Sequence, residues 1–478
     1  MQTRENSQLA GMDVQKSVRP SIAHGSHSWG KAGIRDTWRV VPLILVMSLP
    51  LVAADLPSPL NTIELQDGDT VVFLGDSITH QCLYTQYLED YFYTRFPDRR
   101  IRFHNAGVSG SVAWEALERF DRDVASYKPK YVTLMLGMND GNHEPFNPAV
   151  FATDRQDMSA ILDRIQKIGA MPIILSPTMF DARMRRIRRP DADAESTAMY
   201  NAVLAYYGAW LREIGVERGW GFVDLWSPLN NITLSQRKRD ASFTLIPDSV
   251  HPAPAGHVVM AAAFVNDLDL PREVSSIRVN LTGTDQTRID ATGGKAFEIV
   301  RDVDQFQFRW HARCLPWVLP DQADSGVKLI RLGHSYGRES IEIHGLKPGD
   351  YTFMIDGQEI GDFGSAELEH GIELQDNPRT PQHRQALAVA QLNAARNSGP
   401  VSLLRDEWWN FQDFVDIRRD ALTNPNDKKI QENLLIAQEK IRDMDRRIAQ
   451  ATLEIQKFDD KIAAANKPLP RVYLFRRK

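Results

Sequence analysis

The feature that most constrains this chain is an alternation, over residues 55–270, of short apolar runs with longer helical patterns. Strands that are covered on both faces show such near-continuous apolar runs. The alternation predicts a parallel sheet whose strands are joined by crossover helices, in a three-layer α/β/α sandwich. The expected strands are residues 70–74, 101–104, 131–136, 172–175 and 221–225, and the expected helices are residues 81–96, 112–126, 150–168 and 197–218.

Past residue 274 the pattern changes to short β-rich pieces that are separated by turn residues. A Lys-Pro-Gly-Asp turn at residues 347–350 is typical of a connection between two strands. We therefore predict a small β-sandwich over residues 274–374. Its expected strands are residues 276–281, 297–300, 306–310, 339–343 and 351–355.

Residues 375–478 have a helical pattern, with helices expected at 379–397 and 403–419 and then one long helix. The long helix carries a heptad seam, in which apolar residues alternate in steps of four and three. Two interpretations stay open: a coiled coil that joins two copies in a homodimer, or a long helix that lies against its own protein. The seam consists of Ile430, Leu434, Ala437, Ile441, Met444, Ile448, Ala451, Ile455, Phe458 and Ile462.

Residues 1–54 read as an N-terminal extension that ends in a signal peptide. Lys31, Arg35 and Arg39 precede the apolar run 40–51, and small residues up to Ala54 follow it. The run is short and contains two prolines, which argues against an uncleaved membrane span. We expect cleavage after this segment, no stable membrane span afterwards, and a secreted or periplasmic protein. A true start downstream of the first residue would account for the long polar stretch before the run.

Charge and cysteine content narrow the class of protein further. The chain has 57 Lys and Arg against 62 Asp and Glu, so its formal net charge is −5. Without a broad basic excess, a nucleic-acid partner is not expected. Its two cysteines, Cys82 and Cys314, fall in regions that we assign to different domains, so the sequence does not indicate a disulfide.

A serine stands where a parallel strand is expected to end. The segment Gly75, Asp76, Ser77 follows the run 70–74 directly, and ligands bind at this edge of an open α/β sheet. A serine hydroxyl becomes a good nucleophile only beside a base, which is normally a histidine held by a carboxylate. Asp248 and His251 provide such a pair on one loop. We predict that Ser77, His251 and Asp248 act together as nucleophile, base and orienting acid.

Two further strand ends offer hydrogen-bond donors for a developing oxyanion. They are the segments 105–110 and 137–140, in which the backbone amide of Gly107 and the side-chain amide of Asn139 are the candidates. The backbone amide of Ser77 is expected to be the third donor. We expect Asp76 to hydrogen-bond within the turn around Ser77.

These four segments, in this order, resemble the blocks of the SGNH hydrolases, also called the GDSL esterase family. The resemblance covers residues 68–268, and its one mild departure is Ile78, where the family usually has leucine. It implies a flavodoxin-like α/β fold and a serine esterase that works through an acyl-enzyme. The β-sandwich and helices beyond this region look like extensions of some secreted bacterial relatives, which is a looser likeness.

The predicted substrate is a small-molecule or glycan ester, and the predicted reaction is the removal of O-acetyl groups from carbohydrates. Two alternatives stay open: a lipase or thioesterase for longer acyl chains, and a glycan-binding surface protein. No metal or other cofactor is predicted, because the histidines and carboxylates near the four segments lack ligand spacing. The other histidines in this region, His80, His104, His143 and His257, are interpreted as structural.

Overall fold

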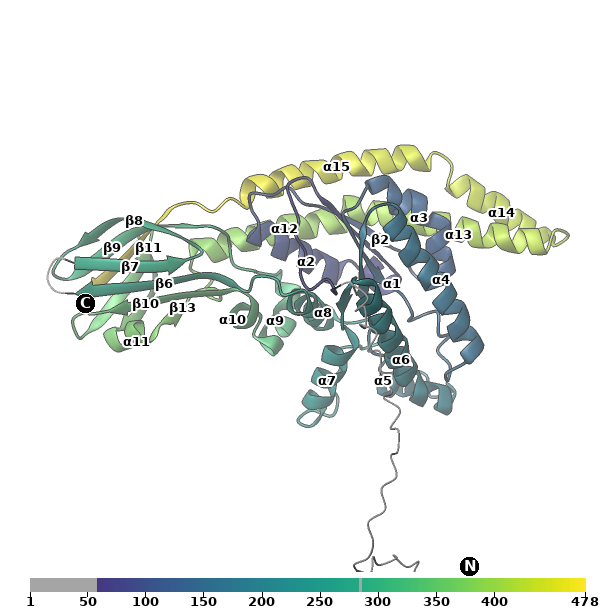
Figure 1. Ribbon diagram of the computed structural model, residues 1–478, viewed down its shortest axis with the longest axis horizontal. Coiled ribbons are helices and arrows are strands. Elements are labelled where there is room, and N and C mark those ends of the chain that lie inside the picture. Colours follow the sequence, from purple (N-terminus) through teal and green to yellow (C-terminus); the bar gives the residue numbers. More distant parts are fainter. Residues whose placement is uncertain (1–57, 283–285) are drawn as a thin grey trace, which may run out of the picture. The chain divides into compact units, whose positions relative to one another are not determined.

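Figure 1 shows the computed structural model of the chain, which describes residues 58–282 and 286–478. The predicted signal peptide in residues 1–54 lies outside the described residues. The described part contains an α/β unit (residues 58–270), a β-sandwich and a helical tail (residues 381–465). Within these ranges, every helix is too short or too polar to span a membrane.

The α/β unit is built on a five-stranded parallel sheet, as the sequence predicts. Its strand order is β2-β1-β3-β4-β5, so the direction in which strands are added reverses beside β1. Ligands of open α/β sheets bind outside the carboxyl ends of the strands at such a reversal. The strands are β1 (Thr70–Gly75), β2 (Arg102–Gly107), β3 (Tyr131–Met135), β4 (Met171–Leu175) and β5 (Gly221–Val223).

Helices cover both faces of this sheet, which confirms the three-layer prediction. Alternate residues of β1 point to opposite faces, and Val71 and Phe73 pack with α2 and α8 while Val72 and Leu74 pack with α3 and α4. The helices are α1 (Ser77–His80), α2 (Leu83–Arg95), α3 (Ala113–Asp123), the 3-10 turn η1 (Ala125–Tyr127), α4 (Pro148–Lys167), α5 (Ala182–Arg188), α6 (Ala194–Arg218), α7 (Trp226–Arg237) and α8 (Pro254–Asp267).

Two sheets form the β-sandwich, with strand orders β13-β10-β6-β7 and β12-β11-β14-β9-β8. Apolar side chains of both sheets meet in one core, which includes Ile341, Phe353 and Phe475. The elements are β6 (Glu273–Thr282), β7 (Gln286–Thr292), β8 (Gly294–Arg301), β9 (Gln305–Ala312), β10 (Arg338–His344), β11 (Asp350–Ile355), β12 (Gln358–Gly364), α11 (Ser365–His370), β13 (Ile372–Glu373) and β14 (Arg471–Arg477).

The β-sandwich differs from the prediction in that it is not one continuous segment. The helices η2 (Asp321–Ala323), α9 (Asp324–Ile330) and α10 (Leu332–Tyr336) leave it and pack on α8. Leu319, Ala323 and Leu332 are buried in the core of the α/β unit. Conversely, β14 comes from residues that we expected in a helical region, and it pairs with β9 and β11.

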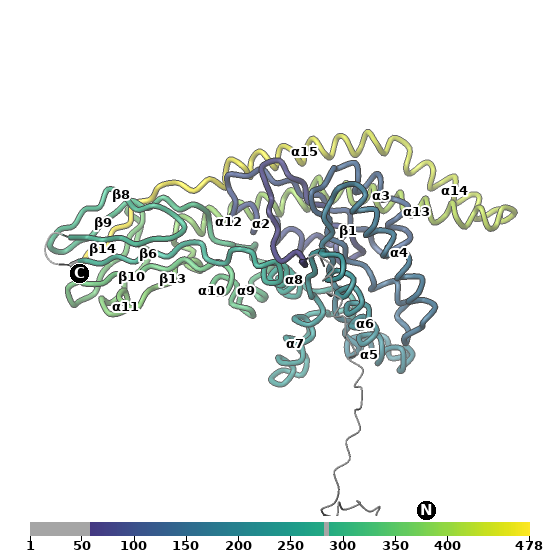
Figure 2. Tube along the Cα trace, viewed as in Figure 1, coloured from purple at the N-terminus to yellow at the C-terminus, as the bar shows by residue number. Residues whose placement is uncertain are grey.

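The helical tail consists of α12 (Pro381–Ser398), α13 (Pro400–Thr423), α14 (Lys428–Lys440) and α15 (Met444–Ala465). The predicted long helix is therefore two helices, because Asp443 has a positive φ of 58° that ends the regular ladder. Figure 2 shows that α14 and α15 run back along α13 and α12. The seam residues Ala437, Ala451 and Ile462 are buried within the chain, which agrees with a helix that lies against its own protein. A homodimer stays a prediction.

Polar side chains bind the tail tightly to the α/β unit. The guanidinium of Arg396, in α12, is 2% exposed and donates to Glu89 of α2 at 3.3 Å and to Asp459 of α15 at 2.7 Å. Asn397 donates to the same Glu89 carboxylate at 2.8 Å. Burial raises the pKa of Glu89, while Arg396 and Asn397 act in the opposite direction. The tail is thus fixed to α2 through a buried charged network.

Both cysteines are buried, free thiols. Cys82 precedes α2, whereas Cys314 follows β9 and accepts a hydrogen bond from Arg95. Burial raises the pKa of each thiol, to about 11 for Cys82. Neither thiol is therefore in the reactive, ionised form at neutral pH.

Candidate active site

The turn from β1 into α1 presents Ser77 at the carboxyl edge of the sheet. Asp76 caps α1 by accepting a hydrogen bond from the Ile78 amide at 2.9 Å. Burial raises the pKa of Asp76 to about 7, and nearby Asp140 contributes, although the Ile78 hydrogen bond acts against it. Gly75 allows this turn, because a Cβ there would overlap the Thr79 side chain. Ser77 is 8% exposed at the start of the helix.

The loop before α8 carries the predicted acid and base. Asp248 Oδ1 accepts hydrogen bonds from the amides of Val250 at 2.9 Å and His251 at 2.7 Å. Ser249, which lies between Asp248 and Val250, has a φ of 85°, which folds the loop back tightly. Burial acts to raise the pKa of Asp248, but these amides and the His251 ring outweigh it, so the pKa lies below its usual value. The carboxylate is therefore ionised at neutral pH.

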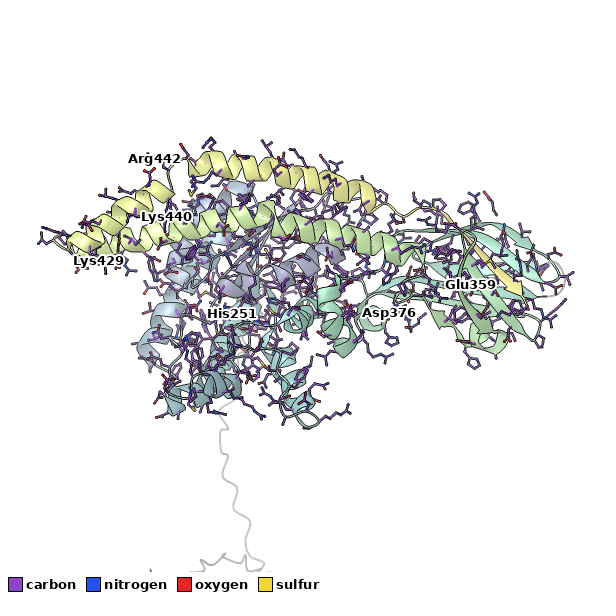
Figure 3. All side chains as sticks on the ribbon, turned by 180° about the vertical axis from the view of Figure 1, so that it is seen from behind. His251, Glu359, Asp376, Lys429, Lys440 and Arg442 are labelled. Atoms are coloured by element: carbon purple, nitrogen blue, oxygen red, sulfur yellow. The ribbon has the colours of Figure 1, made fainter. Side chains whose placement is uncertain are left out.

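The structure brings Ser77, His251 and Asp248 into one hydrogen-bonded chain. Nδ1 of His251 lies 2.7 Å from Asp248 Oδ2, and Nε2 lies 2.8 Å from Ser77 Oγ, across 174 positions of sequence. The carboxylate fixes the tautomer in which Nδ1 carries the hydrogen, so Nε2 is free to accept the serine proton. Figure 3 shows His251 in the α/β unit, well separated from Glu359 of the β-sandwich. This arrangement can activate the serine hydroxyl for attack on a carbonyl.

Asn139 lies in the loop that follows β3, beside the segment after β2. Its side-chain nitrogen donates to the Ser111 carbonyl at 3.1 Å, which leaves its second hydrogen available. The neighbouring Asp140 holds this loop, because its carboxylate accepts the amides of Ala113 and Gly137, each at 2.8 Å. Burial raises the pKa of Asp140 to about 6. Asp140 is the last residue of the segment 137–140, and the sequence pattern alone does not indicate this role.

Gly107 does not have the predicted arrangement of a free donor. Its amide donates to the Asn105 side chain at 2.9 Å, and that side chain in turn donates to the Thr79 carbonyl at 2.8 Å. A Cβ at Gly107 would overlap the backbone of Thr79 and His80. The prediction of Gly107 as an oxyanion donor is therefore corrected: this glycine allows β2 to approach α1 closely.

Gly110, three residues further, fits the role better. It is exposed and has a φ of 80°, and within the described residues its amide has no hydrogen-bond acceptor. Asn139 bonds to the next residue, Ser111, so the two candidate donors are neighbours. The sequence carried a usable signal, since Gly110 is the second glycine of the same segment and lies beyond the strand.

The remaining histidines of this region have structural contacts. The ring of His104 stacks on Tyr127, and burial lowers its pKa to about 3. His257 bonds to the Gln81 side chain at 2.9 Å and has its pKa lowered to about 3 by burial. His80 bonds to the Gly107 carbonyl at 3.1 Å. Among the histidines of the described residues, only His251 hydrogen-bonds to Ser77.

Comparison with known proteins agrees with this geometry. The model of the GDSL-like lipase/acylhydrolase family matches residues 73–259, a stretch that contains Ser77, Asn139 and His251. These residues form an SGNH/GDSL hydrolase domain. An acetylxylan esterase from Geobacillus stearothermophilus is 25% identical over 228 residues, which are 43% of this chain and 96% of that protein. The chain is a serine ester hydrolase.

The solved structures extend the likeness beyond the SGNH/GDSL hydrolase domain. One described as a gut microbial diltiazem-metabolizing enzyme covers 87% of this chain and 99% of its own, with a TM-score of 0.74 and 24% identity. This match shows that the two chains share a fold over most of their length. A structure of the acetylxylan esterase from Geobacillus stearothermophilus covers 43% of this chain and 96% of its own, at 22% identity and a TM-score of 0.34.

Proposed function

We propose that this chain is a carbohydrate O-acetylesterase in which Ser77 is the nucleophile. The observation that carries the proposal is the continuous chain of hydrogen bonds from Asp248 through His251 to Ser77 Oγ, at 2.7 and 2.8 Å. The acetylxylan esterase relative, which the SGNH/GDSL hydrolase domain matches over almost its full length, supports acetate as the acyl group.

In the first step, Ser77 Oγ adds to the ester carbonyl while His251 Nε2 takes the hydroxyl proton. The Asp248 carboxylate stabilises the imidazolium that forms, without taking up a proton itself. Collapse of the tetrahedral intermediate breaks the bond to the sugar oxygen, which leaves with the proton from His251. An acetyl ester on Ser77 remains.

In the second step, a water molecule gives its proton to His251 and attacks the acetyl carbonyl. The bond to Ser77 Oγ then breaks, acetate leaves, and the serine regains its hydrogen from His251. In both steps the negative carbonyl oxygen accepts hydrogen bonds from the amides of Ser77 and Gly110 and from the Asn139 side chain. Each such donor typically contributes about 100-fold to 1,000-fold to turnover.

The decisive experiment replaces the nucleophile. Ser77→Ala should lower acetate release from acetylated xylan at least about 10,000-fold while the fold is retained. Ser242→Ala removes an exposed serine hydroxyl and is the matched control, so it should keep full activity. Substantial turnover by Ser77→Ala would remove this serine from the mechanism.

The acyl chain is tested with a pair of esters that differ only in length. The proposal requires a higher kcat/KM on an acetate ester than on the corresponding octanoate ester. A preference for octanoate would instead favour a lipase or thioesterase.

We also propose that the protein is exported, because basic, apolar and small residues follow one another in the order of a signal peptide before Asp55. Mass spectrometry of the chain from the periplasmic or secreted fraction of a producing cell tests this. A mature chain that begins at Asp55 is expected, and recovery of the uncut chain from the cytoplasm would contradict export.

A further inference from the structure

Helix α5, which follows β4, carries an unusual concentration of positive charge. Five of the seven residues 183–189 are arginines: Arg183, Arg185, Arg186, Arg188 and Arg189. Within the described residues, none of the five forms a salt bridge, whereas Arg237 of α7 pairs with Asp181 at 2.6 Å. Four of the five are exposed, and Arg185 is half-buried.

This helix begins directly on the loop that carries the catalytic pair. The Asp181 amide donates to the Ser249 carbonyl at 2.9 Å, and Ser249 lies between Asp248 and His251 in sequence. Asp181 then caps α5 by accepting the amides of Arg183 and Met184, each at 3.2 Å. The first turn of α5 is therefore fixed to the backbone of the acid–base loop.

The Arg185 side chain packs on Phe180, the residue before Asp181. Its guanidinium lies 5.1 Å from the centre of the Phe180 ring, and that ring lies 5.9 Å from the His143 ring. Burial and then Arg189 lower the pKa of Arg185, while the Asp248 carboxylate acts in the opposite direction. Burial lowers the pKa of His143 to about 4, and both Arg185 and His251 add to this effect. Arg185 and the acid–base pair thus lie within electrostatic reach of one another.

Helix stability alone does not account for these arginines. Basic residues in the last turn suit the helix dipole, but Arg183 lies in the first turn. Arg189, which ends α5, is four positions from Arg185, and like charges at this spacing repel. The Asp181 carboxylate, the buried acid at this end of α5, already accepts from Arg237 and from Thr244 at 2.6 Å. An anion on this face would relieve the repulsion.

We propose that the arginines of α5, led by Arg185 and Arg189, bind a carboxylate on the substrate, so that the enzyme acts on acetylated glycans that carry uronic acid residues. The planar guanidinium matches a carboxylate with two parallel hydrogen bonds. Helix α5 starts on the loop that carries His251. One substrate molecule can therefore place its carboxylate on α5 and its ester at Ser77. This inference rests on the proposed O-acetylesterase activity and adds the charge of its substrate.

The test compares two acetylated xylo-oligosaccharides, one neutral and one with a glucuronic acid side group, and measures kcat/KM for each. The wild-type protein should prefer the acidic substrate, and this preference should weaken at high salt. In Arg185→Gln/Arg189→Gln, the acidic-to-neutral ratio should fall about tenfold or more. Lys428→Gln/Lys429→Gln removes two exposed charges from α14 and should keep the wild-type ratio.

An unchanged acidic-to-neutral ratio in the arginine variant would overturn the proposal. This includes the case in which kcat/KM falls equally on both substrates and the melting temperature is lower. A stronger preference for a sulfated than for a uronic acid substrate would overturn the carboxylate assignment. A second pair, a neutral and a carboxylated aryl acetate, separates this inference from the proposed function. If only the aryl acetates react and their ratio depends on α5, then the glycan substrate is wrong and the carboxylate site stands.

Discussion

The β-sandwich and the helical tail both follow the SGNH/GDSL hydrolase domain in the sequence, yet they bury their apolar residues in different places. Ile341, Phe353 and Phe475 of the β-sandwich belong to a core that contains only residues of the sandwich itself. By contrast, Val389 and Ile462 of the tail belong to the main core of the hydrolase domain. The tail therefore completes that domain, whereas the β-sandwich adds a second hydrophobic centre.

The two regions also differ in their charged contacts. Arg396 of the tail and its partner Glu89 of α2 are almost fully buried, so neither charge is solvated by water. In the β-sandwich, the ion pair between Arg278 and Glu342 remains accessible to water, because these side chains are 58% and 28% exposed. A segment that follows a domain in sequence is thus a separate unit only if its apolar residues form a hydrophobic core of their own.

The largest expected effect is the loss of the buried charge in the tail. Arg396→Met leaves Glu89 buried without its partner, which should lower the free energy of unfolding of the hydrolase domain by about 3–5 kcal/mol. Urea denaturation followed by both tryptophan fluorescence and ester hydrolysis measures this. The two curves should shift together, because the tail and the hydrolase domain share a core.

The matched control is Arg100→Ala, which breaks an ion pair with Asp460, the neighbour of Asp459 on α15. Both partners of that pair are about 70% exposed, at 69% and 70%. Its removal should change the free energy of unfolding by less than about 0.5 kcal/mol. A loss below about 1 kcal/mol in Arg396→Met as well would mean that the tail is not fixed through this network.

A smaller effect, which depends on pH, is expected where the β-sandwich joins the hydrolase domain. Burial raises the pKa of Glu339, on β10, from about 4.5 to about 7, while Arg95 of α2 acts to lower it. Between these values the folded protein holds a proton that the unfolded chain has released, so stability falls as the pH rises through this window. Glu339→Gln should therefore stabilise the protein by roughly 3 kcal/mol at pH 8.

The gain in Glu339→Gln should disappear near pH 4, where both the folded and unfolded forms of the wild type carry the proton. Thermal unfolding at both pH values checks this. Glu359→Gln removes an exposed carboxylate from the same β-sandwich and is the control. A gain of equal size at both pH values would contradict the buried-carboxylate explanation.

The smallest effect comes from deleting one methylene group in each region. Ile343→Val in the β-sandwich and Ile462→Val in the tail should each lower the free energy of unfolding by about 0.5–1.5 kcal/mol. Only the tail variant should lower the temperature at which ester hydrolysis is lost. If Ile343→Val lowers that temperature equally, the two cores unfold as one.

The sequence was sufficient to predict the parallel sheet and the contact of Ser77 with His251. Both follow from local patterns, because a buried parallel strand is apolar throughout and its carboxyl end marks the ligand edge. Gly107 was misassigned, since a glycine that permits close packing looks the same in sequence as one that offers its amide. Only the Asn105 side chain, which takes up that amide, separates the two cases.

Other features depend on contacts between distant residues, which no local pattern shows. The short helix α9 packs on α8 so closely that a Cβ at Gly326 would lie 2.8 Å from Ala255 Cα. Residues 471–477 contain an apolar run of four residues between arginines, and the sequence does not say which strands they join. The heptad seam continues through Asp443, although the backbone breaks there.

The position of β14 has a consequence for the order of events during synthesis. It lies between β11 and β9, in the middle of its sheet, although it is synthesised after the other four strands of that sheet. Until β14 is added, the facing edges of β9 and β11 stay unpaired, and unpaired edges are sites of wrong pairing between chains. The β-sandwich of the nascent chain therefore stays incomplete while the tail helices dock. It closes when β14 pairs with β9 and β11.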